Sequence, residues 1–149
     1  RDSKGLGDDS AAAFKRLYTI NLQGATEVSG LTGRTALAAA AVKKSLFLDI
    51  VQVLNVVHGM PVADIPAKLE GIAFGQDVTV GGKTRHTLWV ANDNDFLQVV
   101  PNATHSGGTA QNPNQYFVFA FDDNDLPNFQ PQQNRWDSDD REDERGDER

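Results

Sequence analysis

The sequence contains no cysteine. The chain therefore has no disulfide, no thiolate metal site and no thiol nucleophile. The same absence leaves the redox compartment open, because cysteine usage is the property that would indicate it. The chemistry of the chain must be sought among its carboxylate, amide, hydroxyl and imidazole side chains.

Long apolar runs and an excess of basic residues are also missing. No window approaches the ~20 apolar residues that cross a bilayer, and no basic segment leads into an apolar signal core. The chain carries 14 basic and 21 acidic residues, for a net charge of -7. This balance argues against a nucleic-acid surface, which requires clustered Lys and Arg. Because the sequence begins at Arg1 rather than Met, we expect that a preceding segment, signal peptide included, has been removed.

Several catalytic motifs are absent from the sequence. The three histidines, His58, His86 and His105, lack the H-E-x-x-H spacing of a zinc site and are predicted to lie in loops. No G-x-S-x-G nucleophile elbow occurs, and no glycine motif for phosphates or dinucleotides occurs. Asn102 begins a formal glycosylation sequon, which is meaningful only in a secreted eukaryotic protein.

Short segments that are typical of strands lie between many turn residues. The chain has 13 glycines and six prolines. An alanine-rich stretch, TALAAAAVKK, could begin a helix, but we favour a strand for the segment that follows it. The predicted strands are Phe14–Leu22, Ser45–Val51, Leu69–Phe74, Thr87–Ala91 and Tyr116–Phe121. The sequence therefore predicts an all-β fold.

Two parts of the sequence repeat one arrangement, in which an acidic turn and a Gly-rich loop precede a strand. Arg1-Asp2 precedes the first predicted strand, and the run Asn92–Asp95 precedes the last one. This spacing is typical of a β-propeller, whose blades are four-stranded antiparallel sheets. On this interpretation the last three predicted strands are the first, second and third strands of one blade. The first two predicted strands complete the blade before it.

About two incomplete blades cannot close a ring, because propellers have about four to eight blades. We therefore expect residues 1–127 to be the C-terminal segment of a propeller that a separate chain, its N-terminal segment, completes. Residues 128–149 form an acidic tail, in which Arg135–Arg149 holds eight acids and four arginines. Such a composition predicts disorder, and a specific partner for the tail is the alternative.

Oxygen-bearing side chains at two places are candidate cation ligands. Glu70 stands at the start of the predicted inner strand, which would line the propeller channel and face a hard cation. Its alternative is an exposed ion pair with Lys68. The run Asn92–Asp95 lacks the glycine of an EF-hand loop. It is either a cation site of carboxylate and amide oxygens or an Asx turn between strands.

Four segments, taken in order, resemble the C-terminal part of the phytase-like family, which is described by the esterase-like activity of phytase. The resemblance covers most of residues 1–125 and leaves out the acidic tail. It implies a secreted or periplasmic propeller that is stabilised by calcium and acts on small phosphoric esters. The segments are Arg1-Asp2 with its Gly-rich loop, LYTINLQGATEVSG (Leu17–Gly30), AKLEGIAFG (Ala67–Gly75) and LWVANDNDF (Leu88–Phe96).

The resemblance also implies roles for individual residues. Clustered calcium ions would hold the phosphate and lower the pKa of a bound water for in-line attack. No catalytic side chain is assigned. The family pattern has a Glu directly before the Arg-Asp pair, and this sequence starts just after that position. The implied calcium ligands are Glu70, Asp93 and Asp95, with Asn92 and Asn94 orienting them and Asp2 in the equivalent turn one blade earlier.

The sequence leaves two functions open. The first is a calcium-dependent hydrolase of phosphoric esters. The second is a non-catalytic, calcium-stabilised propeller that acts as a binding or structural module, because a fold does not decide an activity.

Overall fold

The structure, a computed structural model, describes residues 1–8, 10–102 and 108–131. Its strands pair in antiparallel sheets, and its two helices are each six residues long. The all-β prediction is confirmed. The elements are β1 (Arg16–Ile20), α1 (Arg34–Ala39), β2 (Lys44–Asp49), η1 (Gln52–Val57), β3 (Leu69–Val80), β4 (Lys83–Asn92), β5 (Val99–Pro101), β6 (Thr109–Gln111) and β7 (Tyr116–Phe121).

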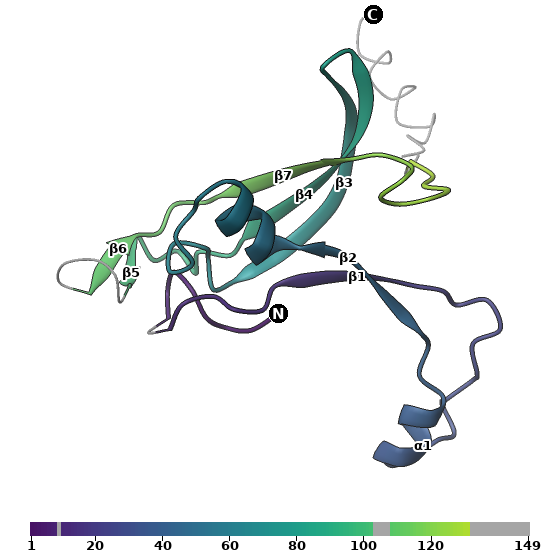
Figure 1. Cartoon of the computed structure of the whole chain (residues 1–149). Helices are drawn as coiled ribbons and strands as arrows, with labels where there is room; N and C mark the ends of the chain where they lie inside the picture. Colours follow the sequence, from purple (N-terminus) through teal and green to yellow (C-terminus); the bar gives the residue numbers. More distant parts are fainter. Residues whose placement is uncertain (9, 103–107, 132–149) are drawn as a thin grey trace, which may run out of the picture.

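The largest sheet has the strand order β3-β4-β7 (Figure 1). Strands β1 and β2 form a second sheet, and β5 and β6 form a third. These neighbours are the ones expected for three consecutive strands of one blade and two of another. That the sheets are blades of a propeller stays a prediction.

Strands β3 and β4 are longer than predicted because a two-residue turn joins them. Gly81 and Gly82 have φ angles of 58° and 75°, and two successive positive φ angles suit the turn that connects a twisted hairpin. The added part of β3 is exposed to solvent. Gly75, a residue type common in turns, marked the end of the predicted strand.

The second predicted strand, Ser45–Val51, ends in the structure at Asp49, two residues earlier than predicted. Asp49 closes β2, and its Oδ1 accepts a hydrogen bond from the backbone N–H of Gln52 at 3.2 Å. An aspartate in this position satisfies a free N–H at the start of a helix, so the chain turns into η1. In the described residues no helix has the length and apolar character needed to cross a bilayer.

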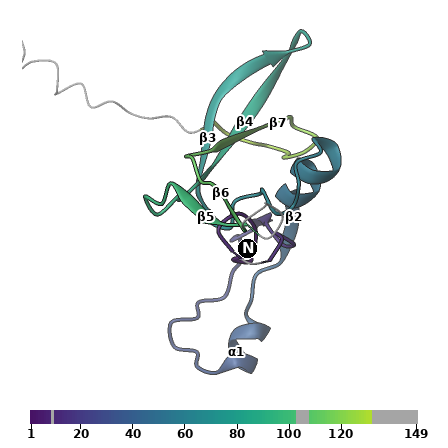
Figure 2. The same cartoon turned by 90° about the vertical axis from the view of Figure 1, so that its left-hand side faces the viewer.

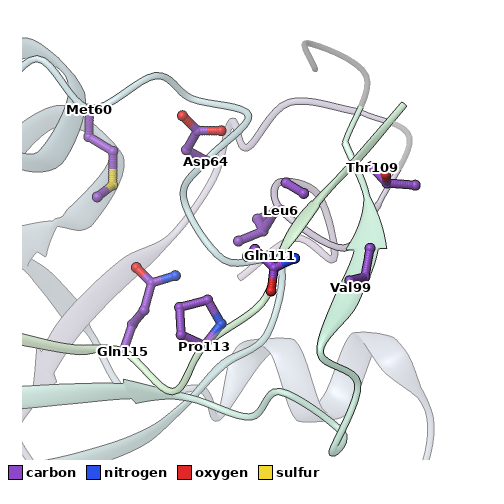
Figure 3. Close-up of a pocket in the computed structure, with 9 residues that line it drawn as sticks. Leu6, Met60, Asp64, Val99, Thr109, Gln111, Pro113 and Gln115 are labelled. Carbon is purple, nitrogen blue, oxygen red and sulfur yellow. The ribbon is translucent and has the colours of Figure 1, made fainter. Parts of the chain in front are cut away.

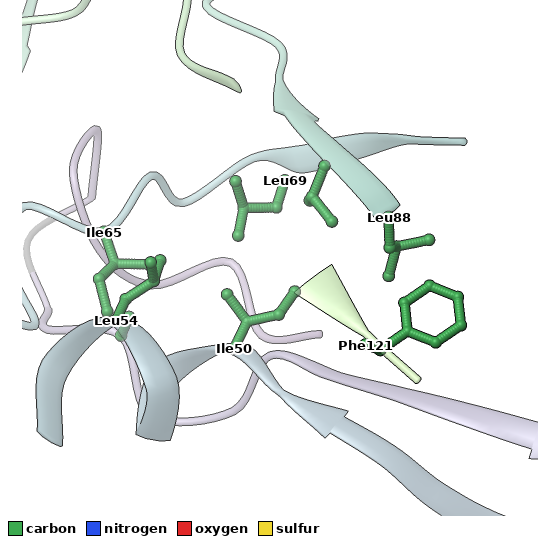
Figure 4. Close-up of a cluster of buried hydrophobic side chains, with 8 residues drawn as sticks. Ile50, Leu54, Ile65, Leu69, Leu88 and Phe121 are labelled. Atoms are coloured by element: carbon green, nitrogen blue, oxygen red, sulfur yellow. The ribbon is translucent and has the colours of Figure 1, made fainter. Parts of the chain in front are cut away.

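The core lies between η1, the start of β3, and strands β4 and β7 (Figure 4). Leu88 is 1% exposed and Ile65 is fully buried. Burying a side chain of this size contributes about 1.5–3 kcal/mol. The buried cluster is Ala12, Ile50, Leu54, Ile65, Leu69, Leu88, Val90 and Phe121. Leu69 belongs to it, so the core fixes the start of β3 next to the candidate ligand Glu70.

Helix α1 lies at the tip of an arm between β1 and β2, away from the largest sheet in both views (Figures 1 and 2). None of its residues is buried. It begins at Arg34, one residue before the alanine-rich stretch that the sequence marked as a possible helix, and continues into that stretch. The high helix propensity of alanine, rather than packing against the rest of the chain, therefore accounts for this helix.

The predicted acidic tail begins at Asn128, and residues 132–149 of it lie outside the described residues. Within the described part, the Phe129 ring packs against Phe74, His86 and Phe121, with centroid distances of 4.7, 4.8 and 5.2 Å. The chain therefore remains attached to the sheet for at least two residues beyond the predicted boundary at 127.

Candidate functional site

The N-terminal segment lies beside the segment that leads into β3. Leu6 N donates to Ile65 O at 2.9 Å, and Ala67 N donates to Leu6 O at 2.9 Å. Gly5 permits this approach: its φ is 121°, and a Cβ there would lie 2.0 Å from Ile65 O. The two segments thereby form adjoining walls of one cleft.

A buried lysine fixes the start of the chain against these walls. Lys15 is 1% exposed, and its Nζ donates to Asp2 Oδ1 at 2.9 Å, to Asp2 O at 3.1 Å and to Ala67 O at 3.1 Å. Asp2 Oδ2 accepts the backbone N–H groups of Ala13 and Phe14 at 3.0 and 2.8 Å. Internal partners thus occupy both oxygens of Asp2, one of the six residues of the predicted metal site.

These contacts set the acidity of Asp2. Burial raises the pKa of its carboxyl group, but the hydrogen bond from Lys15, the two backbone N–H groups and the charge of Lys15 together outweigh burial. The net result is a pKa below the usual value, so the carboxylate is charged at neutral pH.

Glu70 occupies a β-bulge at the start of β3. Leu69 is opposite Asn92 and Gly71 is opposite Ala91, so Glu70 has no residue of its own across the sheet. A bulge changes the direction of a side chain locally. Here the Glu70 carboxylate forms an ion pair with Arg1, whose guanidinium donates to Oε1. The alternative pairing of Glu70 with Lys68, expected from their spacing, does not form.

In the run Asn92–Asp95, Asn92 ends β4, and Asp93 and Asn94 begin two overlapping Asx turns. Asp93 Oδ1 accepts the N–H of Asp95 at 2.9 Å, and Asn94 Oδ1 accepts the N–H of Phe96 at 3.1 Å. Asp95 and Phe96 have positive φ angles of 52° and 58°. Aspartate tolerates such a backbone better than most residues. Phe96 is 99% exposed beside it.

A buried asparagine holds this turn in place. Asn112 Nδ2 donates to Asn94 O at 3.0 Å and to Leu97 O at 3.1 Å. The Asn92 side chain adds a further hydrogen bond at the start of the turn, since its Oδ1 accepts the N–H of Gln115 at 2.7 Å. Asn92 and Asn94 therefore use their amide groups to position the turn that carries Asp93 and Asp95.

These parts enclose a cleft of about 430 Å³, which we call the charged cleft. The N-terminal segment, the segment before β3, the Asn92–Asp95 turn and β5 all contribute to it. Its charged lining side chains are Arg1, Asp8, Lys68, Asp93 and Asp95. Glu70 reaches the same region through its ion pair with Arg1.

Basic side chains face the carboxylates of this cleft. Lys68 Nζ lies 2.6 Å from the Asp95 carboxylate. The hydrogen bond to Asp95 raises the pKa of Lys68, and the negative charges of Asp93 and Glu70 raise it further. Three predicted ligands therefore act electrostatically on one ammonium group.

The donor groups of the charged cleft fit a hard cation in chemistry, since carboxylate and amide oxygens are what calcium binds. Their arrangement differs from a closed metal site. In the part of the chain that the structure describes, no group of three His, Cys, Asp or Glu side chains is placed to hold one metal ion. The ammonium of Lys68 instead provides the positive charge beside Asp95. The predicted ligand set stays a prediction.

A comparison with family models matches residues 1–96 to the phytase-like family, described as the esterase-like activity of phytase. The chain belongs to the phytase-like family. The matched part of this phytase-like chain contains Arg1, Lys68, Glu70 and the whole Asn92–Asp95 turn. The resemblance of residues 97–125 stays an expectation. Neither the curated proteins nor the solved structures include a match to the chain.

A larger cleft of about 680 Å³, which shares Leu6 with the charged cleft, is also present in the phytase-like chain (Figure 3). Its described lining includes Met60, Asp64, Gln111 and Gln115, but no Lys or Arg. A phosphate is recognised best by Arg and Lys side chains. The charged cleft, although smaller, is therefore the better candidate site in this phytase-like chain.

His86 of the phytase-like chain was predicted to lie in a loop, and that prediction is wrong. It is a residue of β4, where its Nδ1 lies 2.8 Å from Asp77 Oδ1 and its Nε2 lies 3.6 Å from Asp123 Oδ1. The hydrogen bond with Asp77 raises the pKa of His86. His58 follows η1 in a turn as predicted, and His105 lies outside the described residues.

The asparagine of the formal sequon in this phytase-like chain is 1% exposed. Asn102 Nδ2 donates to Ala63 O and to Asp64 Oδ1, both at 3.0 Å. A glycan needs an exposed acceptor asparagine. In this conformation the side chain of Asn102 is therefore inaccessible to glycosylation.

Proposed function

We propose that the charged cleft takes part in calcium-dependent hydrolysis of phosphoric esters. The observation that carries the proposal is the meeting of Arg1 and Lys68 with Asp93 and Asp95 at one cleft, within the region that matches the phytase-like family. Arginine and lysine suit phosphate oxygens, and the carboxylates suit a hard cation. A small phosphoric ester is the substrate class whose hydrolysis would use both the basic side chains and a cation held by the carboxylates.

The side chains at the charged cleft fall into two groups: carboxylates that would hold calcium and basic side chains that would bind phosphate. Glu70, Asp93 and Asp95 would hold calcium, which when bound supplies charge neutralisation of the phosphate and a more acidic water. Arg1 and Lys68 would donate hydrogen bonds to phosphate oxygens. Asp2 has both oxygens occupied, so it keeps the cleft wall in place through Lys15.

A second candidate function is a calcium-stabilised binding module without catalysis. It is favoured by an apolar hollow of about 520 Å³ on the β3-β4-β7 sheet, lined by residues that include Ile72, Phe74, Trp89 and Tyr116. Ile72 is 57% exposed and Tyr116 is 67% exposed. Exposed apolar patches of this kind mark interaction surfaces. We propose that another segment of the same propeller, as a separate chain, covers this hollow in the secreted or periplasmic protein.

Hydrolysis of a chromogenic phosphomonoester, with and without a calcium chelator, tests the first function. We expect chelator-sensitive turnover, and a loss of about 10²-fold in Glu70→Gln and Asp93→Asn, because each removes one carboxylate that would hold the calcium. Glu27→Gln, an exposed acid in the α1 arm, is the matched control. Circular dichroism confirms that each variant is folded. Absence of chelator-sensitive turnover in the wild-type protein would contradict the hydrolase and leave the binding module.

A further inference from the structure

We propose that His86 is a pH-sensitive latch, which holds residues 127–131 against the β3-β4-β7 sheet while its imidazole ring is protonated and releases them when the ring loses its proton. The latch consists of Asp77, His86, Asp123 and Phe129, and none of these described residues lines the charged cleft. The switch is therefore independent of the proposed function.

Two carboxylates face the two ring nitrogens of His86. Asp77 Oδ1 lies 2.8 Å from Nδ1, and Asp123 Oδ1 lies 3.6 Å from Nε2. The register of β3 and β4 shifts between Gly75 and Val78, and such a bulge changes the direction of the side chains within it, here that of Asp77. A neutral imidazole carries one N–H, whereas the imidazolium carries two. Only the protonated ring can therefore serve both carboxylates, which come from β3 and from the turn after β7.

The charged neighbour of His86 on β4 fixes the base of the held segment. Arg85 forms an ion pair with Asp122, and Asp122 O accepts the N–H of Leu126 at 3.0 Å. Leu126 packs against the core. A backbone N–H, together with the hydrogen bond and charge of Arg85, lowers the pKa of Asp122, so this pair stays charged while an imidazole titrates. The turn before residue 127 is therefore a fixed hinge.

Beyond this hinge the segment depends on one aromatic ring. In the residues that the structure describes, no hydrogen bond involves residues 127–131. The Phe129 ring instead packs on His86 at a centroid distance of 4.8 Å, and on Phe74 and Phe121. An aromatic ring attracts a neighbouring cation more strongly than a neutral group. Loss of the proton therefore weakens the contact with Phe129 as well as the contact with Asp123.

The charges around the ring set the direction of the switch. The hydrogen bond with Asp77, and the charges of Asp77 and Asp123, raise the pKa of His86. The protonated form therefore predominates at and below the ordinary histidine pKa of about 6.5, and it is lost as the pH rises through the raised value. Residues 127–131 are thus held at mildly acidic pH and released at alkaline pH.

Release of the segment enlarges an apolar surface. Phe74, whose ring lies 4.7 Å from that of Phe129, also lines the apolar hollow of the β3-β4-β7 sheet. When Phe129 leaves, the Phe74 ring loses its cover on that side. The latch therefore couples pH to the apolar area that this sheet offers to a partner.

NMR of the full chain over the range in which histidine titrates tests the latch. We expect the heteronuclear NOE of the amides of residues 128–131 to fall by about half as the pH rises, with the same midpoint as the His86 ring signals. His86→Gln, which is neutral at every pH, should show the low value throughout while the β1 and β2 signals stay as in wild type. His58→Gln is the matched control and should titrate like wild type. A segment that keeps its order at alkaline pH, or in His86→Gln, overturns the latch.

Two further variants test the parts of the switch separately. Asp123→Asn, at a side chain that is 80% exposed, should move the midpoints of His86 and of residues 128–131 to lower pH by the same amount. A shift of the His86 midpoint alone overturns the coupling. Binding of an apolar fluorescent dye should rise about twofold in wild type above the midpoint, and Phe129→Ala should bind the larger amount at every pH. Equal dye binding by wild type on both sides of the midpoint overturns the exposure of Phe74.

Discussion

Lys15 Nζ and Asp2 Oδ1 lie 2.9 Å apart, with the lysine side chain buried and the aspartate side chain 19% exposed. This pair joins the residue before β1 to the N-terminal segment that forms a wall of the charged cleft. Because Lys15 also donates to Ala67 O, it ties that wall to the entrance of β3. One buried cation therefore holds together the parts that carry Arg1, Lys68 and Glu70.

Replacing this cation should destabilise the fold. Lys15→Met leaves Asp2 Oδ1 and Ala67 O without the ammonium donor, and we expect a loss of about 2–4 kcal/mol in the free energy of unfolding. Urea unfolding at pH 7 measures it. Lys83→Met is the exposed control, with an expected change within about 0.5 kcal/mol. Equal stability of Lys15→Met and wild type would show that Lys15 is not an anchor.

The same pair predicts acid sensitivity. The folded-state pKa of Asp2 is lowered, so its contribution to stability is present above the unfolded pKa of about 3.9 and is lost as the pH falls through the folded value. We expect the urea midpoint of wild type to fall as the pH is lowered from about 5, with a smaller fall in Asp2→Asn. Parallel pH profiles for the two proteins would contradict this assignment.

His86 predicts the opposite pH dependence. Its folded-state pKa is raised by Asp77 and Asp123, so its contribution is complete below the unfolded pKa of about 6.5 and is lost as the pH rises through the folded value. We expect the melting temperature of wild type to fall over that range and His86→Gln to fall less. His58→Gln is the control, and an NMR titration of His86 that shows no raised pKa would disprove the cause.

The strands could be predicted because apolar and polar residues alternate in Phe14–Leu22, and because Tyr116–Phe121 is a short aromatic and apolar run between turn residues. The same rule placed Ile50 and Val51 in a strand, whereas Asp49 supplies a helix start directly before them. The grouping of Glu70 with the Asn92–Asp95 turn was predicted from chain order and family resemblance. Their charge partners were not, because Arg1 and Glu70 are 69 positions apart and no local pattern pairs them.

The close approach of Gly5 to Ile65 O gives a prediction that separates the cost of a strained φ angle from the cost of a steric clash. Gly5→Ala must adopt a φ near 121° and place its Cβ against Ile65 O. Gly24→Ala, in the exposed arm, meets a φ of 72° with nothing within 4 Å. We expect the Gly24 variant to lose about 1 kcal/mol of unfolding free energy and the Gly5 variant at least about 3 kcal/mol. Equal losses in urea unfolding would mean that Gly5 is required for its φ angle alone.

The buried amide of Asn112 gives the most direct test of how the candidate site is positioned. Asn112→Ala removes the hydrogen bonds to Asn94 O and Leu97 O and leaves those carbonyls without their donor. We expect a loss of about 1–3 kcal/mol in unfolding free energy. Amide exchange should accelerate at Asp95, Phe96 and Leu97 more than in β4, because the turn opens locally before the sheet does.

The neighbouring exposed residue supplies the control for that experiment. Asn114→Ala changes the same side chain type two positions away, at an exposed position, and should leave both measurements nearly unchanged. If Asn112→Ala instead accelerates exchange equally throughout β4 and the turn, the asparagine stabilises the whole sheet. Selective acceleration in the turn, together with weaker calcium binding, would show that Asn112 holds Asp93 and Asp95 in the geometry that a cation requires.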